Sequence, residues 1–263
     1  MKDYLVFRLY GPMASWGQPA VGGDRATAIA PTRSAILGLL GAALGIKRDD
    51  EQQLDALHTS VQVATKQVTP TSLLRDYHTS QVPSRNNKYV YRTRKNELLD
   101  EPKEKLNTIL STRDYRCDGI WVVAISLTQD KHFSLDQLKK ALIKPVYVLS
   151  LGRKSCPLAA PLMPVLLASV SLREALDYPF PSIMDSDKPH LDKIWLSPNK
   201  LSTYTWEGSV DEFPGETALT THPWDDPINR DRWQFKQRTM HQITVHQITV
   251  HQITTHQVKV EEA

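Results

Sequence analysis

The segment spanning residues 31–45 most strongly constrains how this chain can fold. Apolar residues run almost all round this segment, a pattern that predicts a helix buried on most of its surface. Thr32 is the predicted N-cap, because its hydroxyl can accept an N–H of the first turn. Gly38, Gly41 and Gly45 lie three and four residues apart, so they share one face that another backbone can approach closely.

The start of this helix is a candidate anion site. Arg33 and Ser34 occupy its first positions. Free N–H groups and the positive end of the helix dipole favour a negative charge at that point. The sequence therefore predicts a core helix whose N-terminus can hold a phosphate group.

Other periodic segments indicate an α+β fold. β-forming runs predict strands at residues 4–10, 61–65, 119–127 and 146–149, and residues 73–78 can continue the sheet. Ser134 is predicted to cap a helix over residues 135–142, and a shorter helical pattern covers residues 54–57. The order strand, helix, strand at the start is typical of a ferredoxin-like or RRM-like unit.

The organisation along the chain predicts a core with an insertion and a smaller second part. We expect an RRM-like core over residues 1–160, interrupted by an insertion at about 79–113. Residues 161–240 lose regular pattern and predict a smaller, irregular, β-rich lobe, with strand-like islands at 194–196 and 204–206 and with Trp233 and Phe235 pinning its end.

The last part of the chain, residues 241–263, is an internal repeat. His241-Gln-Ile-Thr-Val is repeated from His246, and then with changes from His251 and His256. A five-residue period scatters the histidines around a helix and over both faces of a strand, which disfavours metal binding. We therefore predict a low-complexity, loosely β-prone tail.

Composition excludes several classes of protein. Cys117 and Cys156 are too few for a disulfide framework or a zinc site. No signal peptide opens the chain, and the apolar run over residues 35–46 is too short to cross a bilayer. These observations predict a soluble cytoplasmic protein without membrane contact, bound metal or cofactor.

Charge is unevenly distributed along the chain. Residues 1–160 hold 23 Lys and Arg against 15 Asp and Glu, whereas residues 161–263 hold 9 against 14. A basic front half suggests a polyanionic partner. The alternative is that the charges are segregated by chance on a solvated surface.

The insertion contains a basic stretch interleaved with tyrosines. Residues 80–95 include no acidic residue, and Tyr89 and Tyr91 would share one face of a strand. Such a ribbon suits the backbone and bases of a nucleic acid, although a solvated loop is the alternative. Its candidate contact residues are Arg85, Lys88, Tyr89, Tyr91, Arg92 and Arg94.

Two further loops carry nucleic-acid chemistry. In residues 11–19, Trp16 can stack on a base, with Ser15 and Gln18 as hydrogen-bonding neighbours, or it can simply plug the loop onto the core. In residues 151–157, Gly152 is followed by two cations and a hydroxyl, a combination that holds phosphate but matches no Walker loop.

Four blocks of sequence resemble a known family. They are GPMASWGQP at residues 11–19, PTRS with LGLLGA within residues 31–42, LRDYHT at residues 74–79 and LGRKSCP at residues 151–157. Together they are similar to the Cas-five family of CRISPR-associated RAMP proteins, subtype I-E.

The resemblance implies an RRM-like domain with a projecting basic thumb that binds the 5′ handle of CRISPR RNA. It also implies a noncatalytic place at one end of a Cascade surveillance complex in antiviral defence, near target DNA. The implied protein partners are the backbone RAMP subunits and the large subunit, to which this chain would bridge. The candidate RNA-binding residues are Ser15, Trp16, Gln18, Arg25, Arg33, Ser34, Arg75, His78, Arg153, Lys154 and Ser155.

One alternative activity remains open. Relatives in another subtype cleave precursor RNA by acid–base chemistry with tyrosine, lysine and histidine. Here Tyr77, His78 and Lys154 are the candidates for a metal-independent endoribonuclease, but their spacing shows no proton-transfer arrangement. The central expectation is that Arg33 and Arg153, from two distant loops, converge on the RNA phosphates.

Overall fold

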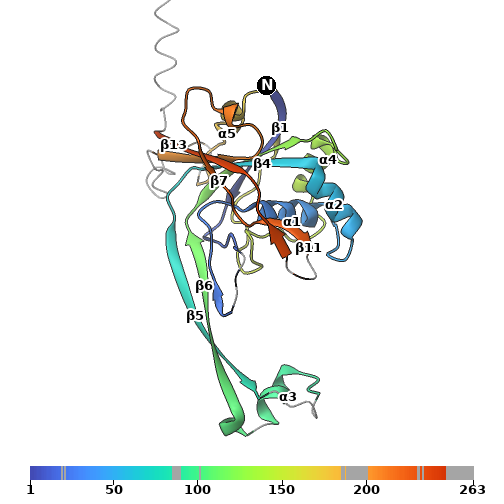
Figure 1. Ribbon diagram of the computed structural model, residues 1–263, viewed down its shortest axis with the longest axis vertical. Helices are drawn as coiled ribbons and strands as arrows, with labels where there is room; N and C mark the ends of the chain where they lie inside the picture. The colour runs from blue at the N-terminus through green and yellow to red at the C-terminus, as the bar shows by residue number, and fades with distance from the viewer. Residues whose placement is uncertain are drawn as a thin grey trace, which may run out of the picture.

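The computed structural model describes residues 1–18, 20, 22–84, 90–100, 102–184, 187, 201–229, 232 and 234–246. Its main feature is a seven-stranded antiparallel sheet in the order β10-β13-β9-β4-β7-β1-β8 (Figure 1). The strands are β1 (Lys2–Tyr10), β4 (Val61–Gln67), β7 (Ile120–Leu127), β8 (Val165–Val170), β9 (Leu201–Trp206), β10 (Leu219–Thr221) and β13 (Met240–His246).

Both faces of this sheet are covered by apolar clusters. The helices α1 (Arg33–Leu44), α2 (Glu51–Ser60) and α4 (Leu135–Ile143) pack with Leu5, Phe7 and Leu9 of β1. On the opposite face, the short helix α5 (Leu172–Leu176) packs with Tyr4 and Val6. Because alternate side chains point to opposite faces, a strand covered on both sides needs an almost continuous apolar run. This explains the composition of β1 and β7, both of which the sequence predicted.

The helix that opened the sequence argument is present, but its ends differ in detail from the prediction. Thr32 is the N-cap residue, yet its side chain makes no capping hydrogen bond. Gly45 ends the helix in the left-handed conformation (φ +78°), where a Cβ would lie 2.9 Å from Cγ1 of Val146. Gly38 is exposed and has open space where its Cβ would be, so the prediction of close backbone approach is wrong there.

A long antiparallel hairpin projects from the main sheet (Figure 1). Its strands, β5 (Ser72–Pro83) and β6 (Leu106–Cys117), pair from Ser72↔Cys117 to Pro83↔Leu106. The hairpin is therefore longer at both ends than the insertion predicted at 79–113. The helix α3 (Arg94–Leu99) and the 3-10 turn η1 (Lys103–Lys105) connect β5 to β6, and α3 lies at the far end of the hairpin (Figure 1). The short strands β2 (Met13–Ala14) and β3 (Asp24–Arg25) pair with the other end of β6.

Two sequence predictions in the middle of the chain need correction. Residues 146–149 do not form a strand; instead the N–H groups of Val146 and Tyr147 donate to the carbonyls of Ala43 (3.0 Å) and Ala42 (3.1 Å), which lays this segment on the end of α1. The strand β8 and helix α5 went unpredicted, because β8 is an edge strand with a half-exposed pattern. The predicted island at 204–206 lies in β9, whereas residues 194–196 and Trp233 are outside the described residues.

The C-terminal region contributes to the main sheet. The strand β13 contains the first five-residue repeat and pairs with β9 from His241↔Trp206 to His246↔Leu201. The prediction that this repeat belongs to a loose tail is wrong, because Ile243 is buried in the core. Beyond residue 160, the described strands β8, β9, β10 and β13 all belong to the main sheet, and β11 and β12 pair only with each other. The hairpin of β11 (Asp226–Asn229) and β12 (Gln234–Lys236) and the 3-10 turn η2 (Val210–Glu212) complete the elements. Residues 247–263 lie outside the described part.

Candidate nucleic-acid interface

The two loops that carry candidate RNA-binding residues meet beside the root of the hairpin. The N–H of Ser15 donates to the carbonyl of Leu151 at 2.9 Å. Gly152 has a positive φ of +85°, and a Cβ on it would lie 1.9 Å from the carbonyl oxygen of Ser15. Only glycine fits this conformation and this contact, so Gly152 is what allows residues 151–157 to lie on residues 11–18.

Arginine side chains from three segments gather around Asp114 of β6. Arg75 of β5 makes two hydrogen bonds to the Asp114 carboxylate, at 2.8 and 3.0 Å. Arg153 donates to the backbone carbonyls of Arg25 (3.0 Å) and Asp114 (3.4 Å), and its guanidinium lies 5.0 Å from the ring centre of Tyr115. The hydrogen bond from Arg75, with Arg116 and Arg153 close by, holds the pKa of Asp114 below its usual range.

Positive charge exceeds negative charge in this group. Arg75, Arg116 and Arg153 lie near the carboxylate of Asp114, Arg25 is joined to Arg153 through its backbone carbonyl, and Lys154 follows Arg153 in the chain. The nearby Asp24 carboxylate accepts a hydrogen bond from Thr112. The side chain of Arg75 is 59% exposed, and Gln18, Arg25, Lys154 and Ser155 are also exposed. We name Arg25, Arg75, Arg116, Arg153 and Lys154 the root cluster. Its arginines are held by hydrogen bonds within the protein, and Arg25, Arg75 and Lys154 are exposed to solvent, where an incoming phosphodiester can contact them.

Ser15 and Trp16 serve the fold and cannot reach a ligand. Ser15 is buried, and its hydroxyl donates to the carbonyl of Asp114 at 3.0 Å. Trp16 is 1% exposed and packs edge-on against Trp121, with ring centres 5.1 Å apart. The expectation that Trp16 stacks on a base is therefore wrong, and the alternative, a tryptophan that plugs its loop onto the core, is what the structure contains.

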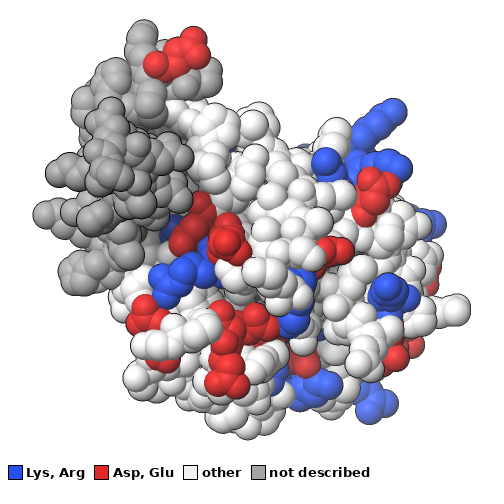
Figure 2. All heavy atoms as spheres, turned by 90° about the horizontal axis from the view of Figure 1, so that it is seen from above, with Lys and Arg blue, Asp and Glu red and all other residues white. Residues whose placement is uncertain are grey.

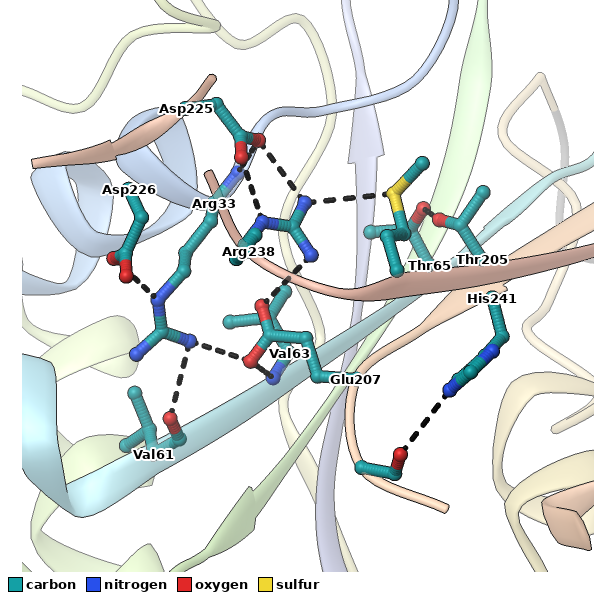
Figure 3. A network of polar contacts seen from close by, with 12 residues as sticks. Arg33, Val61, Val63, Thr65, Thr205, Glu207, Asp225, Asp226, Arg238 and His241 are labelled. Atoms are coloured by element: carbon teal, nitrogen blue, oxygen red, sulfur yellow. Dashed lines mark hydrogen bonds and ion pairs between the residues drawn. The ribbon is translucent and has the colours of Figure 1, made fainter. Parts of the chain in front are cut away.

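Arg33 is also occupied inside the protein (Figure 3). Its guanidinium donates to Glu207 (2.6 Å), to Asp226 (3.3 Å) and to the carbonyls of Val61 (3.2 Å) and His58 (2.7 Å). Its side chain is 7% exposed, and those of Glu207 and Asp226 are 11% and 9% exposed. The expectation that Arg33 converges with Arg153 on RNA is wrong, because its charge is already neutralised by buried carboxylates.

The start of α1 does hold an anion, but the protein supplies it. The N–H of Arg33 donates to the carboxylate of Asp225 at 2.9 Å, and Arg238 binds the same carboxylate through two hydrogen bonds of 2.6 and 3.0 Å. Ser34 lies half-buried beside this position, with its hydroxyl 3.3 Å from that of Thr32. The helix N-terminus is thus used to tie the C-terminal region to the core.

We name the buried group of Arg33, Glu207, Asp225, Asp226 and Arg238 the ion network. Glu207 also lies 3.3 Å from Arg238 and accepts the N–H of Val63 at 3.2 Å, whereas Asp226 contacts the ring of His58 and lies 3.6 Å from Lys236. Sequence reasoning missed this network. Its available signal was the acidic excess beyond residue 160, part of which neutralises the basic front half internally.

The hairpin residues predicted to contact RNA are only partly described. Arg92 and Arg94 are exposed, Arg94 pairs with Glu97, and Tyr91 is half-buried. Arg85, Lys88 and Tyr89 lie outside the described residues. The prediction that Tyr89 and Tyr91 share one face of a strand therefore also concerns residues outside the described part.

His78 and Tyr77 of the candidate catalytic set both lie exposed on β5. The side chain of His78 is 50% exposed and lies 3.9 Å from Asp76. Tyr77 is 67% exposed, and as the preceding residue of the same strand it points to the opposite face.

Charge at the other end of the molecule is mixed. Figure 2, seen from the end opposite the hairpin, shows Lys and Arg side chains interspersed with Asp and Glu where the described residues are visible. Within the described residues, no helix is long and apolar enough to span a membrane.

This geometry defines a class of protein. It is a mixed α/β protein, made mostly of strands, with a basic cluster at the root of a long hairpin. Residues 4–241 match the model of the family described as CRISPR-associated protein (Cas_Cas5), and the chain belongs to this family. It is similar to the "CRISPR system Cascade subunit CasD" of Escherichia coli (strain K12), with 44% identity over 171 residues that cover 62% of this chain and 70% of that protein.

Solved structures share the fold. A chain of a "CRISPR RNA-guided surveillance complex" superposes with a TM-score of 0.58 at 22% identity, covering 92% of this chain and 89% of that one. A "Crystal structure of Cas protein" gives a TM-score of 0.57 at 22% identity and covers 92% of this chain and 95% of the other. These likenesses describe the overall architecture.

Proposed function

We propose that this chain is a noncatalytic subunit of a type I-E Cascade complex in the cytoplasm and binds the 5′ handle of CRISPR RNA. Family membership and the 44% identity with a Cascade subunit support this assignment. In this role the chain caps one end of the backbone RAMP subunits and bridges to the large subunit. Target DNA is recognised by pairing with the guide RNA and not by this chain.

The arrangement of the first part of the chain supports an RRM-like core. The strands β1, β4, β7 and β8 lie in the order β4-β7-β1-β8, every neighbouring pair is antiparallel, and α1 and α4 follow β1 and β7 in sequence. This is the strand order of a ferredoxin-like unit with two βαβ halves. The β5–β6 hairpin enters between β4 and β7, as a thumb that projects from such a core.

The observation that carries the RNA-binding proposal is the root cluster. Asp114 holds Arg75 by its carboxylate and Arg153 by its carbonyl, so neither arginine must be ordered when RNA arrives. Single-stranded RNA is bound by phosphate anchors together with hydrogen bonds to splayed bases. Lys154 and Arg25 add phosphate contacts, and the exposed Gln18 and Ser155 are positioned to bond base edges.

The test is the salt dependence of binding to a single-stranded RNA with the handle sequence. Each phosphate contact contributes about 0.7 to the slope of log K against log salt concentration for a single strand. The double variant Arg153→Ala with Lys154→Ala should therefore bind more weakly and lower the slope by about 1.4. Lys131→Ala, an exposed residue before α4, is the matched control. An unchanged slope in the double variant would contradict the proposal.

The noncatalytic part of the proposal has its own test. Tyr77 and His78 point to opposite faces of β5, so they do not form a proton-transfer pair. Purified protein incubated with a hairpin precursor RNA in EDTA should leave the RNA intact. Cleavage that disappears in His78→Ala would instead establish a metal-independent endoribonuclease.

A further inference from the structure

An exposed apolar surface lies where α1 and α4 end. Four side chains contribute to it, with exposed fractions of 62% for Ile143, 64% for Val146, 45% for Tyr147 and 92% for Val148. Their sequence pattern is typical of a buried strand, yet the described part of the chain provides no strand to pair with them. Apolar side chains gathered in this way on a surface mark an interaction site.

This surface is held in place by the protein's own backbone. The N–H groups of Val146 and Tyr147 donate to the last turn of α1, and Val146 packs on Gly45, where a larger residue would collide with it. The segment is therefore ordered before any partner binds. An ordered apolar segment loses little conformational entropy on binding, which favours its use as an anchor.

Beside Val146, the ends of α1 and α4 border a shallow, open groove of about 520 Å³. Ala43, Leu44 and Ala141 contribute apolar surface to it, and Lys140 and Lys144 line it as well. Lys140 pairs with Asp136 at 2.6 Å, but both side chains are more than half exposed. Such an exposed i, i+4 pair contributes little to stability, so Lys140 can exchange its partner readily.

We propose that this α1–α4 groove docks a protein segment that places an apolar side chain between Lys140 and Lys144 and carries Asp or Glu next to it. The lysines are complementary to carboxylates, and the alanine and leucine floor is complementary to an aliphatic or aromatic side chain. A nucleic acid fits less well, because an apolar floor gives phosphates no hydrogen-bond donors. The partner segment belongs to another subunit of the same complex, a point that rests on the proposed function.

The experiment uses the full chain co-expressed with the other proteins of its CRISPR locus, purified through a tag on this chain. Two variants change the groove: Ile143→Asp alters its apolar side, and Lys140→Glu with Lys144→Glu reverses its charge. Val210→Asp, at an exposed position on η2, and Lys131→Glu are the matched controls. Native mass spectrometry counts the subunits, small RNA is quantified separately, and thermal melting of the isolated chain shows that each variant is folded.

Both groove variants should lose at least 90% of one protein subunit from the purified assembly, keep the RNA and melt within about 2 °C of the unaltered chain, whereas the controls keep every subunit. Retention of all protein subunits in both variants would overturn the proposal. Loss of RNA with all proteins retained would also overturn it and assign the groove to nucleic acid. If the unaltered chain copurifies with proteins but with no RNA, the proposed RNA-binding function fails while the groove is still tested.

Discussion

Replacing Arg33 distinguishes a structural role from an RNA-binding role. Arg33 was predicted from the sequence to bind RNA, and the structure instead places its side chain among buried carboxylates. The variant Arg33→Ala removes a guanidinium that makes four hydrogen bonds, two to carboxylates and two to backbone carbonyls. It leaves the buried carboxylates of Glu207 and Asp226 with fewer positively charged partners. Removing one partner of a buried ion pair costs about 3–5 kcal/mol.

The lower end of that range applies here because both carboxylates keep other partners. Glu207 still has Arg238 at 3.3 Å and the N–H of Val63, and Asp226 still has His58 and Lys236. We therefore expect Arg33→Ala to lower the free energy of unfolding by about 3 kcal/mol. At about 2–4 °C per kcal/mol for a domain of this size, the melting temperature should fall by roughly 6–12 °C.

The assay pairs a thermal melt at neutral pH with the salt dependence of RNA binding, measured at a temperature where the variant is folded. Arg33→Ala should melt early and retain the salt slope of the unaltered chain, whereas Arg153→Ala should lower the salt slope. Adding Glu207→Gln to Arg33→Ala should recover part of the stability, since it removes one of the buried carboxylates that Arg33→Ala leaves with fewer cations. An unchanged melting temperature with a reduced salt slope in Arg33→Ala would refute the assignment of Arg33 to the ion network.

Three further results are expected. Trp16→Ala should lower the free energy of unfolding in urea by about 3–5 kcal/mol, because it empties the buried contact with Trp121; little change in stability with weaker RNA binding would favour base stacking after all. Gly152→Ala should lower the free energy of unfolding by about 1–3 kcal/mol, because an added Cβ must adopt a positive φ and collide with the carbonyl of Ser15; an unchanged urea midpoint would contradict this. Burial raises the pKa of Asp226, but His58, Arg33 and Lys236 outweigh burial and hold that pKa below its usual value. The contribution of Asp226 to stability is therefore present above about pH 4, and it is lost as the pH falls through the pKa of the folded state. Unfolding free energies measured between pH 6 and pH 2.5 should therefore fall less steeply for Asp226→Asn than for the unaltered chain, and equal slopes would show that Asp226 does not contribute.

The candidate site was predictable in part. The loops at residues 11–18 and 151–157 meet, and Asp114 brings Arg75 and Arg153 together, whereas RNA binding by these residues stays a prediction. Asp114, which organises them, was missed because an acidic residue between Arg113 and Arg116 gives no sign by itself that it pairs with an arginine on the neighbouring strand.

The sequence by itself determined the elements whose signal is local. Apolar periodicity and capping residues placed β1, α1, β7 and α4, and four short blocks identified the family. These features depend on neighbours within a few residues along the chain, so they can be read without knowing the fold.

Only the tertiary structure decided which polar and aromatic residues are available to a ligand. Arg33 meets Glu207 across 174 residues of chain, and Trp16 meets Trp121 across the core. The first histidine-containing repeat becomes a strand because β9 lies open beside it. An arginine, a tryptophan or a β-prone repeat looks the same in the sequence whether it faces solvent or a distant partner. Its burial is decided only when the sheet brings those partners together.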